Sequence, residues 1–157
     1  NDDIIVTNGN QTDTIAAYIS EKKTMAQALQ TREYEPDAPN YTPRISSVTT
    51  VGNGVFKFSM SILKRGVYGT CQRLHFHYDG IKSGKARLIH TYAGDGDPLP
   101  SFEGEPSDVD ISGAGDIDSF TAELWSALNS ENKVALYVRY VDLKSRESIT
   151  RIEGKNR

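Results

Sequence analysis

The tripeptide Gly52-Asn53-Gly54, which separates two stretches rich in β-forming residues, constrains the fold of this chain more than any other feature. A short glycine-rich turn with asparagine between such stretches indicates a β-hairpin. After the turn, apolar residues at positions 56, 58, 60 and 62 alternate with polar residues at positions 57, 59 and 61. This period of two predicts a strand with one buried face and one polar face. We therefore expect paired strands over Ile45–Val51 and Val55–Leu63.

Two short helices are predicted ahead of this hairpin. The first follows a strand at Ile4–Thr7 and begins with Thr12 or Asp13 as its cap, because short polar side chains can accept the first free backbone N–H groups. The second opens at Thr24, whose spacing to Gln27 fits a capping box.

The rest of the chain predicts more strands and one longer helix. The expected elements are strands at Cys71–Tyr78, at Arg87–Ala93 and near Val109–Ile111, a helix capped by Asp116, and a closing hairpin of Lys133–Leu143 with Glu147–Ile152. Helices at both ends of a strand-rich middle predict an α+β fold on antiparallel sheets. A chain of 157 residues suits one core, so we expect a single domain over residues 1–157.

Composition argues against several classes of protein. The net charge of -3 and the mixed signs do not favour a basic face for nucleic acid. No apolar run approaches the ~18 residues that a membrane-spanning helix needs. The single cysteine, Cys71, excludes an internal disulfide and suits a reducing compartment. We expect a cytoplasmic protein with no nucleic-acid or membrane partner.

Two stretches rich in proline, residues 34–45 and 90–106, are typical of loops that present functional side chains. The prolines and glycines there stand among charged, amide and aromatic residues, and the second stretch begins with His90 and Tyr92. It also holds four carboxylates that are candidates for a general base or for ribose contacts, namely Asp95, Asp97, Glu103 and Glu105. The alternative for these carboxylates is a solvated acidic loop.

The first stretch ends with Asn40, Tyr41 and Arg44. An arginine where a loop joins a strand can bind a phosphate or a carbonyl oxygen through two parallel hydrogen bonds. The alternative for Arg44 is an ordinary surface ion pair. Asn40 and Tyr41 can bind a heterocyclic carboxamide or donate a proton to a leaving hydroxyl, or they are a turn-forming asparagine and a half-buried tyrosine.

Four further basic side chains lie on predicted strands. Arg139 lies within residues 134–141, which are apolar on both faces and so predict a central strand. It either pairs with a core carboxylate or faces a substrate phosphate. His75 and His77 share a strand face with Arg73. Two histidines at this spacing can bind zinc, but no third ligand follows at a matching spacing, so a hydrogen-bonded strand face is favoured over a metal site.

Taken together, the two loops resemble the conserved segments of the archaeal-type IMP cyclohydrolase family. Residues 6–14, 125–129 and 138–140 match the same pattern, so the resemblance runs from near residue 4 to near residue 156. It implies closure of 5-formamidoimidazole-4-carboxamide ribotide to IMP with loss of water, without cofactor or metal. It also implies a four-layer α-β-β-α sandwich of the N-terminal-nucleophile-hydrolase type.

The resemblance implies a site built from the two loops and their neighbours. The catalytic candidates are Tyr41, Arg44, Glu103 and Glu105. Tyr41 and Arg44 are expected at the reacting end of the substrate, and one of the two glutamates is expected to transfer a proton. Arg73 or Arg139 is expected near the substrate phosphate. The substrate-binding candidates are Asn10, Asp13, Asn40, Arg73, His90, Tyr92, Asp95 and Arg139.

The resembled family has a further segment ahead of this region. We therefore expect the chain to be the C-terminal portion of a longer product, associated with that segment or with further copies of itself. The alternative function is a purine-nucleotide-binding protein on the same scaffold without turnover. An amide hydrolase is disfavoured, because Asn1 cannot serve as an N-terminal nucleophile.

Overall fold

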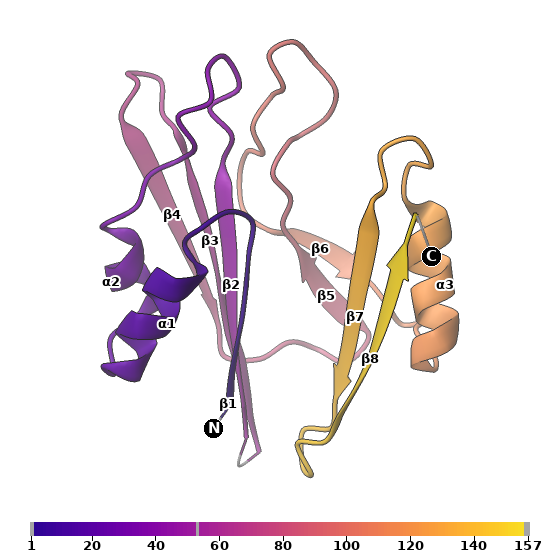
Figure 1. Cartoon of the computed structure of the whole chain (residues 1–157). Coiled ribbons are helices and arrows are strands. Elements are labelled where there is room, and N and C mark those ends of the chain that lie inside the picture. Colours follow the sequence, from indigo (N-terminus) through magenta and orange to yellow (C-terminus); the bar gives the residue numbers. More distant parts are fainter. Residues whose placement is uncertain (1, 53, 156–157) are drawn as a thin grey trace.

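Four antiparallel strands in the order β1-β2-β3-β4 form the main sheet (Figure 1). The computed structural model describes residues 2–52 and 54–155, so Asn1 and the turn residue Asn53 lie outside the described residues. The four strands are β1 (Asp2–Thr7), β2 (Arg44–Gly52), β3 (Val55–Arg65) and β4 (Cys71–Tyr78). Gly52 pairs with Val55 across the turn, which confirms the predicted hairpin.

Two short helices, α1 (Thr12–Ser20) and α2 (Met25–Leu29), cover one face of this sheet (Figure 1). The capping box at the start of α2 is confirmed, since Thr24 and Gln27 exchange side-chain and backbone hydrogen bonds. The predicted cap of α1 is wrong, because Gln11 takes that position instead of Thr12 or Asp13. The Gln11 amide points into the core, where it donates to the Ile45 carbonyl and the Ser46 hydroxyl.

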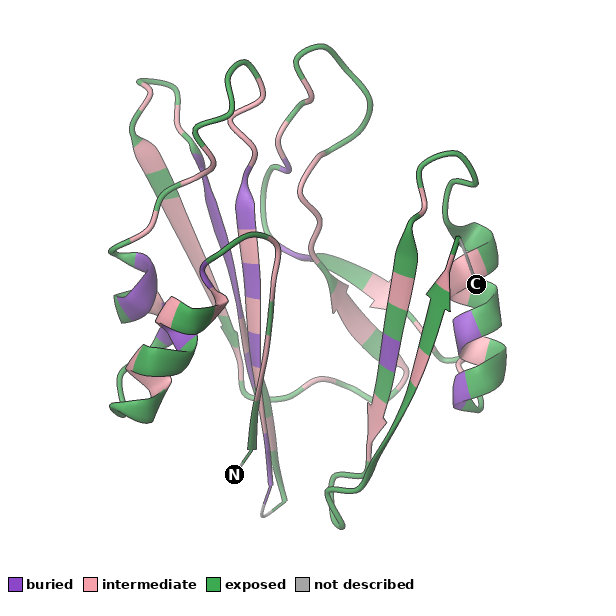
Figure 2. Cartoon of the chain, viewed as in Figure 1, coloured by how far each residue is buried: buried purple, intermediate pink, exposed green. Residues whose placement is uncertain are grey.

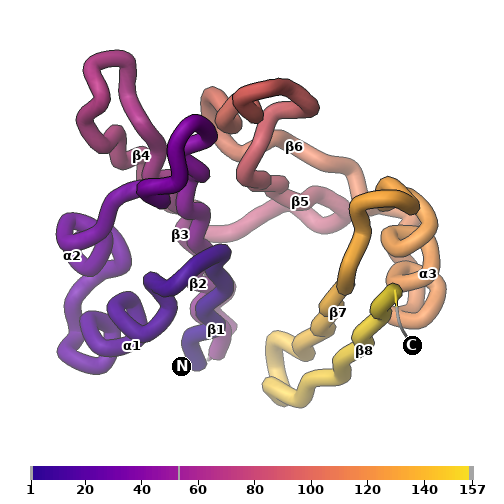
Figure 3. Tube along the Cα trace, turned by 45° about the horizontal axis from the view of Figure 1, so that its top comes forward, coloured from indigo at the N-terminus to yellow at the C-terminus, as the bar shows by residue number. Residues whose placement is uncertain are grey.

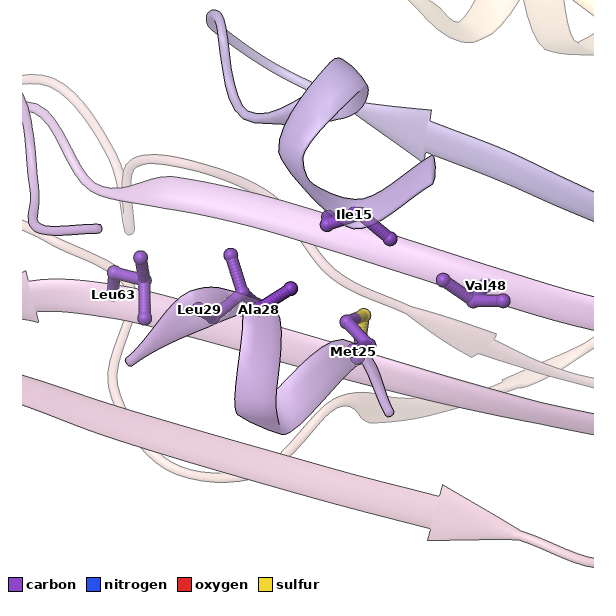
Figure 4. Close-up of a cluster of buried hydrophobic side chains, with 6 residues drawn as sticks. All are labelled: Ile15, Met25, Ala28, Leu29, Val48 and Leu63. Atoms are coloured by element: carbon purple, nitrogen blue, oxygen red, sulfur yellow. The ribbon is translucent and has the colours of Figure 1, made fainter. Parts of the chain in front are cut away.

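The core on this side lies between the two helices and the middle of the sheet. Figure 4 shows its six buried side chains, which are Ile15, Met25, Ala28, Leu29, Val48 and Leu63. Leu63 and Ser61 point toward the helices, so the second half of β3 is buried on both faces (Figure 2). The predicted alternation therefore holds for Phe58, Met60 and Ile62, while the face that was predicted to be polar is buried at Ser61.

The remaining elements lie beyond the other face of the main sheet (Figure 1). They are the pair β5 (Lys85–Leu88) and β6 (Ser107–Asp110), the helix α3 (Ile117–Ala127), and the hairpin of β7 (Ala135–Val141) and β8 (Ser148–Gly154). Asp116 caps α3 as predicted, and α3 packs on the hairpin, where Arg151 of β8 binds Asp118. The overall class, α+β with antiparallel sheets, is confirmed.

Two predictions about these strands are wrong. The strand expected at Arg87–Ala93 covers only Lys85–Leu88, because the chain leaves β5 early to enter the second proline-rich stretch. The strand that carries Arg139 is not central, since β7 pairs only with β8 among the described strands. The face of β7 that carries Arg139 is therefore exposed, and Arg139 is not a buried charge. No helix among the described residues is long and apolar enough to cross a membrane.

We expect Leu63→Ala to lower the free energy of unfolding by about 2–5 kcal/mol, because it opens a cavity in the fully buried cluster. Leu88→Ala is the matched control, since Leu88 is 48% exposed, and its cost should stay within about 0.5 kcal/mol. Urea unfolding followed by circular dichroism measures both. Equal midpoints for the two variants would contradict this account of the core.

Stability should also fall in acid because of His75. Neither of its buried ring nitrogens has a hydrogen-bond partner among the described residues, and burial, followed by repulsion from His77 and Arg73, lowers its pKa. His75 therefore binds a proton more readily in the unfolded chain than in the folded chain. The free energy of unfolding is not reduced by this difference above about pH 6.5, and it declines as the pH falls below that value. In urea titrations His75→Gln should lose less stability than the wild type between about pH 7.5 and pH 5.5. The exposed control Gln72→Asn should keep the wild-type loss.

Candidate active site

The two proline-rich loops, residues 34–45 and 90–106, meet at one end of the main sheet (Figure 1). The Thr42 hydroxyl lies 2.6 Å from the Tyr92 hydroxyl, and the Asn40 side-chain oxygen accepts a hydrogen bond of 3.0 Å from the Leu99 backbone N–H. Asn40 thus bonds across to the second loop, in addition to any role in turn formation. We call this joined pair of loops the loop rim.

Asn8, just after β1, connects the loop rim to the sheet. Its side-chain NH₂ donates to the Pro43 carbonyl and to the Thr91 hydroxyl, both at 3.0 Å, and its oxygen accepts from the Ile45 N–H at 2.6 Å. One amide therefore binds the end of the first loop, the start of the second loop and the first residues of β2. A short side chain with both donors and acceptors is required for this, which asparagine provides.

Arg44 is 8% exposed and lies under the first loop rather than on the surface. Its guanidinium binds Glu35 at 3.0 Å and also contacts the side-chain oxygen of Asn10. Its Nε is buried and has no partner among the described residues. A buried arginine needs such partners because its desolvation is expensive. Asn10, Glu35 and Arg44 therefore hold the first loop against the sheet.

Tyr41 sits at the turn of the first loop with a left-handed φ of 46°. Its ring contacts the Tyr34 ring edge to face, and the Arg65 guanidinium stacks over it at 4.0 Å. Asp37 closes the turn by accepting hydrogen bonds from the Thr42 hydroxyl and N–H, and these bonds hold the pKa of Asp37 below its usual value. The loop is thus fixed by its own hydrogen bonds and presents Tyr41 beside a cation.

Lys64, near the end of β3, is a functional candidate that no sequence motif indicated. It is only 4% exposed, its ammonium binds the Glu103 carboxylate, and it donates a 3.5 Å hydrogen bond to the Phe102 carbonyl. Glu103 itself is 77% exposed at the side chain, so the pair joins the buried sheet to the surface of the second loop. The sequence did contain a signal, since position 64 continues the even-numbered positions that are buried along β3.

Within the second loop, the chain pairs with itself. Tyr92 and Ser101 form a β-bridge, and the His90 ring bonds the Tyr92 carbonyl at 2.6 Å and contacts the Phe102 ring edge to face at 4.3 Å. The tip beyond this bridge carries the exposed Asp95. In the part of the chain that the structure describes, Asp95 and Glu105 make no hydrogen bond or ion pair.

Three predicted binding residues do not lie at the loop rim. Arg73 donates to the Leu29 and Arg32 carbonyls, at 3.1 and 2.8 Å, and so satisfies the end of α2. Asp13 is exposed in the first turn of α1. Arg139 lines a separate cavity between β1 and β7.

The other reactive side chains have structural partners. His77 bonds Ser59 at 2.8 Å, and no group of three metal-binding side chains occurs within residues 2–52 and 54–155. Burial raises the pKa of the Cys71 thiol, which disfavours the nucleophilic thiolate.

The family model described as IMP cyclohydrolase-like protein matches residues 1–146 of the chain. The match includes both loops and every predicted site residue, and it confirms the resemblance read from those loops. No curated protein and no solved structure matches the chain.

We expect Asn8→Ala to loosen the loop rim, because it leaves the Ile45 N–H without an acceptor and removes the bond to the Thr91 hydroxyl. The free energy of unfolding should fall by about 1–3 kcal/mol. Amide exchange in residues 91–102 should also become faster than in the wild type. Asn132→Ala is the control, since Asn132 is exposed in a surface turn. Unchanged exchange in the second loop would show that Asn8 does not hold it.

Proposed function

We propose, since the chain belongs to the IMP cyclohydrolase-like protein family, that it closes 5-formamidoimidazole-4-carboxamide ribotide to IMP with loss of water. In this reaction the carboxamide nitrogen bonds to the formyl carbon and gives up one proton. The formyl oxygen takes up protons and leaves as water, while the former formamido nitrogen loses its proton to form the new C=N bond. Both reacting ends belong to one molecule, so catalysis consists of orientation, charge stabilisation and proton transfer.

The observation that carries the proposal is the buried Lys64 ammonium beneath the joined loops, bound to Glu103. A fixed positive charge in a poorly hydrated place stabilises negative charge that develops on an oxygen. A carboxylate held beside it can accept and return protons. We assign charge stabilisation at the formyl oxygen to Lys64 and proton transfer to Glu103, with Glu105 as the neighbouring exposed carboxylate.

The first loop supplies the groups proposed at the reacting end. Tyr41 offers a phenol proton, and its ring is held by Tyr34 and Arg65. Arg65 has no ion pair among the described residues, so its charge is free to bind the ribotide phosphate. Arg73, expected at the phosphate, bonds the backbone at the end of α2, and Arg139, also expected there, lines the separate cavity. Arg44 acts as a positioning residue, because Asn10 and Glu35 already occupy its guanidinium.

Purine-nucleotide binding without turnover is the second candidate. It is favoured by the fact that Asn40, Arg44 and Tyr92 already bond to other protein groups. Such a closed set of contacts suits recognition, because few of its polar groups are left to exchange protons with a substrate.

The finer fold assignment is also a proposal. The order of layers in Figure 1 is helices α1 and α2, the main sheet, the β7–β8 hairpin, and helix α3. This order supports a four-layer α-β-β-α sandwich of the N-terminal-nucleophile-hydrolase type, in which β7 and β8 belong to the second sheet.

Absorbance measurement of IMP formation from the formylated ribotide tests the function, with Glu103→Gln and Lys64→Met as the informative variants. Each should lower kcat by about 100-fold or more, the usual effect of losing a proton-transfer or charge-stabilising group. Glu103→Gln should leave KM nearly unchanged. Glu131→Gln, an exposed carboxylate in the turn before β7, is the control and should keep wild-type kcat.

The outcomes separate the two candidates. Wild-type turnover that both variants lose supports the cyclohydrolase. Tight binding of the ribotide by calorimetry, without any turnover, assigns the binding function instead. If the protein shows no turnover and no binding of the ribotide, both candidate functions are overturned. Circular dichroism of each variant excludes unfolding as the cause of a lost activity.

A further inference from the structure

Three polar side chains, Asp37, Thr42 and Tyr92, form a hydrogen-bonded chain that passes from the first loop of the rim to the second. The Thr42 hydroxyl contacts the Asp37 carboxylate and lies 2.6 Å from the Tyr92 hydroxyl. Figure 3 shows the two loops side by side, the first in purple and the second in salmon. The chain therefore connects a carboxylate on one loop with a phenol on the other.

The charge of Asp37 sets the direction in which the protons of this chain point. The hydrogen bond from the Thr42 hydroxyl holds the pKa of Asp37 below its usual value, so the carboxylate is ionised at neutral pH. An ionised carboxylate only accepts hydrogen bonds, and a hydroxyl has one proton to give. Thr42 therefore donates its proton to Asp37, and the proton between the two hydroxyls belongs to Tyr92.

Further contacts hold both ends of the chain in place. The Thr42 N–H donates to the other Asp37 oxygen at 2.7 Å, so the carboxylate is bound by two groups of one residue. On the second loop, the bridge between Tyr92 and Ser101 holds the backbone of Tyr92. The direction of the protons is thus fixed by the folded loops before any ligand binds.

As a result, the Tyr92 oxygen is an acceptor toward a ligand at the loop rim. Its proton points to Thr42, and the hydroxyl makes no other hydrogen bond within residues 2–52 and 54–155. A phenol oxygen that has donated its proton can still accept a hydrogen bond. Because Tyr92 is only partly buried, a ligand that brings an N–H or O–H group can reach it.

We propose that Tyr92, oriented by Thr42 and Asp37, accepts a hydrogen bond from the carboxamide NH₂ of the ribotide. This inference rests on the proposed function. The NH₂ group has two hydrogens, and ring closure removes one of them and leaves the other on the nitrogen. Tyr92 binds the hydrogen that stays. The hydrogen that is lost goes to Glu103, two residues beyond the bridge partner Ser101.

The same arrangement makes Tyr92 a specificity residue, with Thr42 and Asp37 as its positioning residues. A ribotide with an NH₂ group at this place provides the donor that the phenol oxygen lacks. A ribotide with a carbonyl oxygen or a methyl group there provides no donor, and the phenol oxygen is left unpaired. A site built to bond an N–H group rejects analogues without it for this reason.

Asp37→Asn tests the direction of the chain, because it should reverse it. The amide oxygen of the variant can still accept from the Thr42 N–H, which places the amide NH₂ at the Thr42 hydroxyl. That NH₂ donates to the Thr42 oxygen, so the Thr42 proton turns to Tyr92. Tyr92 then directs its own proton outward and becomes a donor toward the ligand.

Raman spectroscopy measures this reversal without any ligand. The intensity ratio of the tyrosine doublet is low when the phenol donates a strong hydrogen bond and high when it only accepts one. The difference spectrum between each protein and its Tyr92→Phe counterpart isolates the signal of Tyr92. We expect a higher ratio for Tyr92 in Asp37→Asn than in the wild type.

Calorimetry with two ligands of equal charge measures the specificity. One ligand is 5-aminoimidazole-4-carboxamide ribotide, which lacks the formyl group and cannot close its ring. In the other, an acetyl group replaces the carboxamide, so that CH₃ stands where NH₂ was. The wild type should bind the carboxamide about tenfold more tightly, because the acetyl analogue leaves the Tyr92 oxygen unpaired. Asp37→Asn should bind the two ligands with nearly equal affinity, because Tyr92 no longer offers an acceptor.

Two variants of Thr42 separate the chain from the shape of the loop. Thr42→Val keeps the shape but has no hydroxyl, so it should also lower the preference for the carboxamide. Thr42→Ser keeps the hydroxyl and should keep the preference. Asp79→Asn is the matched control for the lost charge, since Asp79 is exposed just after β4, and it should change neither the preference nor the Raman signal of Tyr92.

The outcomes distinguish this inference from the function on which it rests. An unchanged Raman signal of Tyr92 in Asp37→Asn would overturn the direction of the chain. Turnover by the wild type with a preference that Asp37→Asn retains would overturn the role of Tyr92 and leave the cyclohydrolase in place. If the wild type binds neither ligand and shows no turnover, the proposed function is overturned and the contact between Tyr92 and the carboxamide with it.

Discussion

Burial of β3 on both faces, from Met60 to Lys64, is the constraint on which the rest of the structure depends. On one face Ser61 and Leu63 lie under α1 and α2, which fixes the helices on the sheet. On the other face Lys64 is buried and binds the second loop through Phe102 and Glu103. One short segment therefore holds the helical layer and the loop rim together. A buried ammonium requires a partner, so the position of the second loop is a consequence of the burial of this strand.

Much of the loop rim consists of polar groups that bind one another. Asn8 bonds both loops, Asn40 bonds the second loop, and Arg44 binds Asn10 and Glu35. Each of these groups would be costly to bury without its partner, so the set favours one arrangement of the loops over others. The prolines and the left-handed Tyr41 restrict the backbone further. A rigid rim of this kind suits a reaction in which orientation of one flexible substrate is a large part of the barrier.

The sequence predicted most elements, because hairpin turns and capping boxes are local signals. The β2–β3 hairpin, the Thr24 cap and the Asp116 cap were all found from residues close in sequence. Predictions failed where distant contacts decide the outcome. Gln11 holds the cap position of α1 while its amide bonds the distant Ser46 rather than the helix, and β7 has no second neighbour among the described strands although its composition suggests one. Lys64 was missed because its burial depends on the second loop, which is distant in sequence and binds it through Phe102 and Glu103.

The two sides of the main sheet differ in how far they are covered by other parts of the chain. The helix side and the loop rim are closed by Leu63, Lys64 and the Asn8 contacts, all of which the chain supplies itself. The side toward β7 keeps apolar residues exposed around Arg139, because no described strand covers them. The contacts that order the loop rim involve none of the residues that line the cavity between β1 and β7. A change at Arg139 is therefore not expected to reach the contact between Lys64 and Glu103.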